Sequence, residues 1–136
     1  MLNLMTKYVH LLGKESRRKI IEILATTRGV RELASELNIT PAAVSKYLAG
    51  LTHPSDKVLE KAIEIADEDE IKNIAKIVSQ EFIDGLSSFV EWSYDKNLLD
   101  IKFYKRLNDL TAKVGLVTLS QKAVIPKQDL IKDSDY

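Results

Sequence analysis

The chain has 136 residues, of which 45% are hydrophobic and 29% charged, and it contains no cysteine. This composition is typical of a folded globular protein and argues against an intrinsically disordered one. The absence of cysteine excludes a disulfide framework, a thiolate metal site and a cysteine nucleophile. His10 and His53 are far apart and lack the spacing of metal ligands, so we expect neither a metal nor another cofactor.

No stretch of the sequence approaches the roughly 18–20 unbroken apolar residues that a membrane-spanning helix requires. The apolar N-terminal segment is interrupted by Lys7 and His10 and lacks a small-residue cleavage site, which argues against a signal peptide. We therefore expect a cytoplasmic protein with no membrane partner.

The formal net charge is zero, but the charge is distributed unevenly along the chain. Residues 1–66 contain ten Lys/Arg and seven Asp/Glu, whereas residues 67–136 contain ten and thirteen. Positive charge is densest at Lys14, Arg17, Arg18, Lys19, Arg28 and Arg31. This asymmetry predicts a basic surface that faces DNA in the first half and a neutral-to-acidic remainder.

The first half of the sequence begins with two predicted helices. The first follows Gly13, and its apolar side is formed by Ile20, Ile21, Ile23 and Leu24. We expect residues 26–29 to interrupt it. The second helix is predicted over residues 30–37, and Asn38 suits the left-handed conformation that often ends a helix. We also expect His10 to be packed among its apolar neighbours.

Two further helices are predicted by their start signals. The hydroxyl of Thr40 can cap the free N–H groups of the next turn, and Pro41 at the first helical position removes no needed donor. This third helix is predicted over residues 41–49 and ends at Gly50. Ser55 then begins a fourth helix that reaches about residue 66.

The second half of the sequence predicts two longer amphipathic helices. Apolar spacing predicts one over residues 69–94, with acidic residues at its start, where the helix dipole favours negative charge. The other runs from about Leu98 to Val114 and is expected to stop at Gly115. Residues 116–136 show no clear period and are expected to form a tail.

Residues 30–50 combine the requirements of a helix-turn-helix motif. Two helices that meet at a steep angle need a small residue where they cross, and Ala34 provides it. The turn needs a residue that tolerates positive φ, and Asn38 stands there. Apolar side chains must hold the pair on the core, and Leu33, Leu37, Ile39, Val44 and Leu48 have the right spacing.

This segment resembles helix-turn-helix regulators of the Cro and lambda-repressor-like (XRE-type) family. The family usually follows its recognition helix with a glycine, a proline-containing loop and a Leu-x-x-Ile/Ala-x-x-Ala helix, which here correspond to Gly50, Pro54, Leu59, Ala62 and Ala66. The similarity covers residues 14–66. It implies an N-terminal domain of four to five helices that binds double-stranded DNA through a recognition helix in the major groove.

The sequence departs from the family where members often read base edges. The family often has Gln at the position of Val30 and polar residues early in the recognition helix, where this chain has Pro41, Ala42 and Ala43. Small apolar side chains can contact a thymine methyl but cannot form bidentate hydrogen bonds. We hypothesise that direct readout is modest and that DNA shape and dimer spacing supply much of the specificity.

The candidate DNA-binding residues lie in and around the recognition helix. Ser45 and Lys46 are its polar side chains on the exposed face, and Arg28 and Arg31 flank the second helix, where they can contact phosphates. Tyr47 is expected to pack toward the core. Arg17, Arg18 and Lys19 either extend the basic surface or form a solvated face. The full candidate set is Arg28, Arg31, Thr40, Pro41, Ala42, Ala43, Ser45, Lys46, Thr52, His53 and Ser55.

The predicted C-terminal helices have more apolar positions than a small headpiece can cover. Pairing with a second copy would bury this surplus and place two recognition helices about 34 Å apart, on successive major-groove turns. Their aromatic residues belong to a core or subunit interface, or alternatively line a pocket for an effector: Phe82, Phe89, Trp92, Tyr94, Phe103 and Tyr104. A protein effector could also bind this region.

We therefore expect an all-α chain with a helix-turn-helix domain over residues 1–68, a helical dimerisation or effector region over 69–115 and a tail over 116–136. The expected function is a prokaryotic, homodimeric transcriptional repressor. The alternatives are an antitoxin-like protein that grips a partner, and a plasmid or virus accessory DNA-binding protein. We do not expect an enzyme, since the sequence has no catalytic motif and its carboxylates fall on predicted solvated helix faces.

Overall fold

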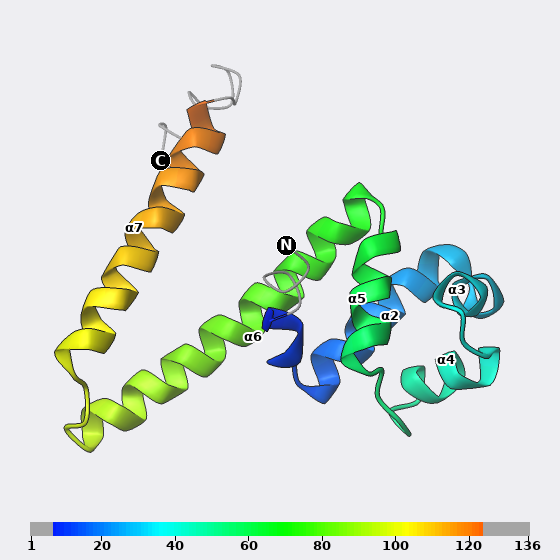
Figure 1. Ribbon diagram of the computed structural model, residues 1–136, viewed down its shortest axis with the longest axis horizontal. Coiled ribbons are helices and arrows are strands. Elements are labelled where there is room, and N and C mark those ends of the chain that lie inside the picture. The colour runs from blue at the N-terminus through cyan, green and yellow to red at the C-terminus, as the bar shows by residue number, and fades with distance from the viewer. Residues whose placement is uncertain (1–6, 124–136) are drawn as a thin grey trace, which may run out of the picture. The chain divides into compact units, whose positions relative to one another are not determined.

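The computed structural model describes residues 7–123, shown in Figure 1. Over this range the chain consists of helices and short loops and contains no strand, which confirms the all-α prediction. It divides into two compact units, one that ends at Ser88 and one that begins at Phe89. None of the helices in residues 7–123 is long and apolar enough to cross a membrane.

The first unit begins with a helical turn at residues 7–10. It continues with α2 (Lys14–Arg28), α3 (Val30–Leu37), α4 (Pro41–Leu48), α5 (Asp56–Ile65) and the first part of α6 (Glu68–Asp95). Figure 1 shows α3 and α4 on the far side of α2 and α5 from α6. The bounds of α3, α4 and α5 agree closely with those expected from the sequence.

The residues expected to cap these helices do so. Asn38 adopts the left-handed conformation, with φ of 57°, at the end of α3. The side chain of Thr40 accepts a hydrogen bond from the backbone N–H of Ala43 (3.1 Å), and that of Ser55 accepts one from Val58 (3.3 Å). Gly50, with φ of 74°, follows α4. These local signals were therefore sufficient to place the helix-turn-helix segment.

The predicted interruption of α2 at residues 26–28 is wrong. The hydroxyls of Thr26 and Thr27 donate back to the carbonyls of Glu22 (2.7 Å) and Leu24 (3.1 Å), so both residues fit within the helix. Only Gly29, with φ of 83°, departs from helical geometry. The helix therefore extends to Arg28.

The first unit has two clusters of buried apolar side chains, and α2 contributes to both. In one, Ile21 and Leu24 pack with residues of α3, α4 and α5. In the other, Ile20 packs with Leu59 and with Ile74 of α6. The first part of α6 is thus integral to this unit, which continues past the boundary expected at residue 68.

The expectation that His10 is packed is wrong. Its side chain is 79% exposed, and its Nδ1 lies 2.8 Å from the carboxylate of Asp56. The apolar neighbours Val9 and Leu12 point into the core, while His10 lies on the opposite, outer side of the same turn. Its pairing with a residue 46 positions away in sequence could not be read from local pattern.

Two carboxylates of α6, Glu70 and Glu81, form hydrogen bonds near the places where this helix meets the rest of the first unit. Glu70 and Asp67 form a capping box, in which each side chain accepts the other's backbone N–H at 2.8 Å. Glu70 is only 2% exposed, so the prediction that the carboxylates lie on solvated faces is wrong for this residue.

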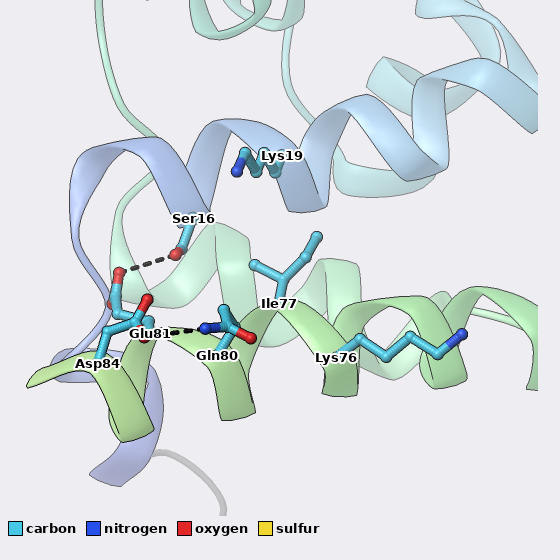
Figure 2. A pocket seen from close by; sticks show the side chains of 7 residues that line it. All are labelled: Ser16, Lys19, Lys76, Ile77, Gln80, Glu81 and Asp84. Atoms are coloured by element: carbon cyan, nitrogen blue, oxygen red, sulfur yellow. Dashed lines mark hydrogen bonds between the residues drawn. The ribbon is translucent and has the colours of Figure 1, made fainter. Parts of the chain in front are cut away.

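Further along α6, Glu81 accepts from the backbone N–H of Gly13 with both oxygens (3.0 Å) and from the hydroxyl of Ser16 (2.7 Å). Figure 2 shows the Ser16–Glu81 bond beside a hollow between α2 and α6.

The second unit contains the end of α6 and α7 (Ile101–Ala123). Asn97, with φ of 56°, ends α6 in a Schellman motif: the N–H of Leu98 donates to the carbonyl of Ser93 (2.9 Å) and that of Asn97 to Tyr94 (3.1 Å). The carboxylate of Asp100 then caps α7 by accepting from the N–H of Phe103 (2.7 Å).

The predicted stop at Gly115 is wrong, because α7 continues through this residue to Ala123. A glycine inside a helix costs about 1 kcal/mol relative to alanine, which is too little to end a helix by itself. Residues 116–123 of the expected tail are therefore helical, and its remainder lies outside the described residues.

Candidate nucleic-acid interface

The packing of α3 against α4 determines which side of α4 faces outward. Ala34 is 1% exposed, and this small buried side chain allows the two helices to approach closely, as expected. Val44, in the middle of α4, is fully buried, while Tyr47 and Leu48 are half-buried against the same cluster. The opposite side of α4 is consequently exposed.

The exposed side of α4 presents small and polar groups. It contains Pro41, Ala42, Ser45 and Lys46, with Ala43 half-buried beside them. Lys46 is the one charged residue of this helix. It forms no ion pair within residues 7–123, so its ammonium group is available to a phosphate or a guanine. A surface with one cation and no carboxylate is compatible with a polyanion.

Two hydroxyls at helix starts are suitably placed for phosphate contacts. Thr40 and Ser55 use their oxygen as a cap acceptor, which leaves the O–H of each free to donate. Both residues are exposed, as are Thr52 and His53 in the loop after α4. The structure therefore brings all these candidates to exposed positions in or next to α4.

The largely buried side chain of Arg17 stabilises the loop after α4 through hydrogen bonds. Its guanidinium donates to the carbonyls of Pro54 (3.0 Å), Leu12 (2.9 Å) and Val9 (3.0 Å), and it pairs with Asp56 at 2.6 Å. The Arg17 side chain is only 12% exposed. Arg17 is therefore a structural residue of this loop.

The neighbouring cation Arg18 pairs with two carboxylates of its own helix, Glu15 (2.6 Å) and Glu22 (2.5 Å). These contacts are those of a solvated helix face. Lys19 is exposed and lines the hollow shown in Figure 2. Arg17 and Arg18 therefore have protein partners in place of a phosphate.

The two arginines that flank α3 have different environments. Arg31 is exposed and forms no ion pair among the described residues. Arg28, in contrast, points inward: it donates to the carbonyl of Ile65 (3.0 Å) and pairs with Glu36 (2.9 Å) and Glu70. Its side chain is only 15% exposed. This arrangement favours a structural role for Arg28 over the phosphate contact expected from the sequence.

The partner of Arg28 is held in its charged form. Burial raises the pKa of Glu70, but hydrogen bonds from the Asp67 backbone, the Thr27 hydroxyl and Arg28 outweigh it, and the pKa lies below its ordinary value. The Arg28–Glu70 pair thus links the end of α2 to the start of α6. Sequence pattern alone gave no sign of it, because the two residues are 42 positions apart.

One residue beside the interface was missed from the sequence. Leu51 is 74% exposed, immediately after α4, and its backbone N–H donates to the carbonyl of Lys46 (2.9 Å). An apolar side chain here could contact a thymine methyl or a deoxyribose. The available signal was its position between Gly50 and Thr52, inside the candidate loop.

Comparison with known proteins agrees with this geometry. Residues 26–69 match a family model described as helix-turn-helix. This match confirms the resemblance to the Cro and lambda-repressor-like (XRE-type) family, whose members are DNA-binding regulators that are typically not enzymes. Searches of curated proteins and of solved structures found no match. Residues 26–69 are thus similar to the helix-turn-helix domain of regulators that bind double-stranded DNA.

Proposed function

We propose that this protein is a sequence-specific transcriptional repressor that binds DNA as a homodimer, with α4 of each copy in the major groove. The observation that supports this most directly is the orientation of α4. Its fully buried Val44 fixes the helix on the core, so that Ala42, Ser45 and Lys46 face outward together. A helix exposed in this way can enter a groove about 12 Å wide.

The contacts divide into two kinds. Pro41, Ala42 and Ser45 lie close to the base edges in the proposed complex, where the first two can contact thymine methyls and Ser45 can donate or accept a hydrogen bond. Arg31, with the hydroxyls of Thr40, Thr52 and Ser55, contacts phosphates, and Lys46 contacts a phosphate or guanine. With few hydrogen-bonding groups at the bases, specificity depends strongly on DNA shape and on the spacing of half-sites.

Two features support dimerisation and repression. One α4 offers few base contacts, and a two-fold pair doubles them across half-sites one helical turn apart. The second unit supplies apolar surface for pairing, since Phe89, Trp92 and Tyr104 are 47%, 54% and 63% exposed. A bound dimer blocks a promoter simply by occupying it, so repression requires no additional contact with the transcription machinery.

The proposal is tested by selecting bound duplexes from a random pool and by mapping bound sites on the genome. We expect two similar half-sites at fixed spacing near promoters. The control is Lys46→Glu, which changes an exposed side chain and should abolish enrichment while its circular dichroism spectrum stays unchanged. No enrichment by the wild-type protein would contradict the proposal, and a long guanine-rich consensus without fixed spacing would contradict the proposed readout.

A further inference from the structure

The fold leaves the apolar side chain of Leu51 uncovered in the loop after α4. Leu51 is 74% exposed, more than any other large apolar side chain of residues 7–88. Single exposed leucines are common on protein surfaces, so exposure by itself indicates no function. Two further observations distinguish Leu51: a hydrogen-bonded turn holds it in place, and it lies at the end of the exposed side of α4.

The turn is a Schellman motif that fixes Leu51 against the last turn of α4. Gly50, with φ of 74°, donates its N–H to the carbonyl of Tyr47 (3.0 Å), and the N–H of Leu51 donates to the carbonyl of Lys46 (2.9 Å). In this motif the residue after the glycine frequently packs on an apolar side chain in the last turn of the helix. Here the corresponding residue is the exposed Lys46, and Leu51 stays uncovered.

The other end of the loop is also fixed. Pro54 is buried, and its carbonyl accepts a hydrogen bond from the largely buried Arg17 (3.0 Å). Arg17 also pairs with Asp56 at 2.6 Å. Because hydrogen bonds hold both ends of the loop, Leu51 is kept on the surface in the folded domain. A side chain on a backbone that is already ordered loses less entropy when it binds a partner.

The exposed side of α4 leads to Leu51. Ala42, Ser45, Lys46 and Ala49 recur at helical spacing and are all exposed. A rise of 1.5 Å per residue places Ala49 about 10 Å beyond Ala42, and the major groove is about 12 Å wide. In helix-turn-helix complexes the N-terminal residues of the recognition helix contact the base edges. In such a complex Leu51 therefore lies near the wall of the groove, which consists of sugars and phosphates.

From these observations we propose that Leu51 packs against the deoxyribose groups at the edge of the major groove. This contact rests on the proposed insertion of α4 into the groove and adds an apolar component to it. Leucine has no group that can bond to a phosphate, whereas the carbon atoms of deoxyribose provide an apolar surface. The contact releases no counterions, so it contributes affinity that salt does not weaken. It supplements the phosphate contacts of Arg31.

Titration of a selected duplex at several salt concentrations tests this contact. Leu51→Ala should weaken binding by about tenfold for each bound copy at every salt concentration, with an unchanged slope of log affinity against log salt. Leu51→Lys places a cation beside the phosphates and should steepen that slope by about 0.9 for each copy. The matched control is Leu11→Ala, because Leu11 is 69% exposed and lies outside α4 and its loop. It should bind as the wild-type protein does, and circular dichroism checks that every variant is folded.

Three results would overturn the deoxyribose contact. Equal affinities of Leu51→Ala and the wild-type protein would show that Leu51 does not touch DNA. If their difference disappeared on a duplex with deoxyuridine in place of thymine, the side chain would contact a thymine methyl and not a sugar. An unchanged slope for Leu51→Lys would place position 51 away from the phosphates. Failure of the wild-type protein to bind any duplex rejects the proposed repressor itself, whereas equal binding by the wild-type protein and Leu51→Ala rejects only this contact.

Discussion

Arg28 and Arg31 are three positions apart in the sequence, yet their different environments indicate different roles. Both looked like phosphate ligands, because each flanks the helix that precedes the recognition helix. In the structure Arg28 reaches the carboxylates of Glu36 and Glu70, whereas Arg31 faces solvent. The sequence showed two cations, but their roles depend on carboxylates supplied by other helices. Only packing could distinguish them.

This difference predicts opposite effects of truncation. Arg28→Ala leaves Glu70 buried without its cation and should lower the free energy of unfolding by about 3 kcal/mol. Arg31→Ala should change stability by less than about 0.5 kcal/mol and weaken DNA binding. Urea unfolding and DNA titration of both variants give the comparison. A stable Arg28→Ala protein with a selective loss of DNA affinity would contradict the structural role.

Glu70 predicts how stability depends on pH. Because its pKa in the folded protein is below the ordinary value, its ionised form stabilises the fold at neutral pH. That contribution is complete above about pH 4.3, the ordinary Glu value, and is lost as the pH falls through the lower folded value. Glu70→Gln should therefore be less stable at pH 7 and lose less stability between about pH 4 and 2.

Unfolding by urea at several pH values measures this effect. The matched control is Glu64→Gln, since Glu64 is exposed and forms no ion pair in residues 7–123. It should follow the wild-type pH profile. If Glu70→Gln followed that profile as well, the account of the Arg28–Glu70 link would be incorrect.

At the scale of helices, the sequence correctly predicted the helices whose start and end depend on residues close by in the chain. Asn38, Thr40 and Ser55 each bond within four residues, and the helices they cap were placed correctly. Glycine was misread at one position. Gly29 and Gly50 have positive φ and follow helix ends, whereas Gly115 lies within α7. A glycine marks a stop only where the chain needs that conformation.

The N-terminus of α2 shows a cap that local pattern could not reveal. No nearby side chain caps Gly13, and Glu81, 68 residues away, accepts its N–H instead. A Cβ at Gly13 would lie 3.2 Å from a Glu81 oxygen, so a small residue suits this close approach. The carboxylate also places negative charge where the dipole of α2 favours it.

Removing this contact should destabilise the first unit. Glu81→Ala leaves the Gly13 N–H and the Ser16 hydroxyl without their acceptor and should lower the free energy of unfolding by about 2 kcal/mol. Asp84→Ala is the matched control, because Asp84 lies one turn further along α6 and its bond is to exposed Gln80 (2.9 Å). Chemical denaturation compares the two. Equal effects would mean that Glu81 does not connect α6 to α2.

At the scale of the whole chain, the net charge is zero, but individual helices differ in the sign of their charge. α4 has one cation and no carboxylate, α6 is acidic and α7 is basic. The sequence correctly indicated that the halves differ in charge, but its description of the second half as neutral to acidic does not distinguish α6 from α7. The basic character of α7 is already present in residues 98–114, which contain four Lys/Arg and two Asp, but a charge count over the whole second half conceals it.

The exposed side of α4 could be predicted, since periodicity placed Val44 toward the core and Lys46 away from it. The number of cations available to DNA could not be predicted from the sequence, because Arg17, Arg18 and Arg28 have protein partners. Among residues 7–123, Arg31 of α3 and Lys46 of α4 are exposed cations without an ion pair, so each copy offers at least these two to DNA. The expected electrostatic contribution to DNA binding is smaller than the sequence suggested.

The most direct test is the salt dependence of binding to a selected duplex. If two copies bind and each neutralises two phosphates through Arg31 and Lys46, the plot of log affinity against log salt should have a slope of about −3.6. Lys46→Glu should weaken binding and make that slope shallower. Failure of the pure protein to bind duplex DNA at low ionic strength, or a slope near zero, would contradict the account of α4 as a DNA-reading helix.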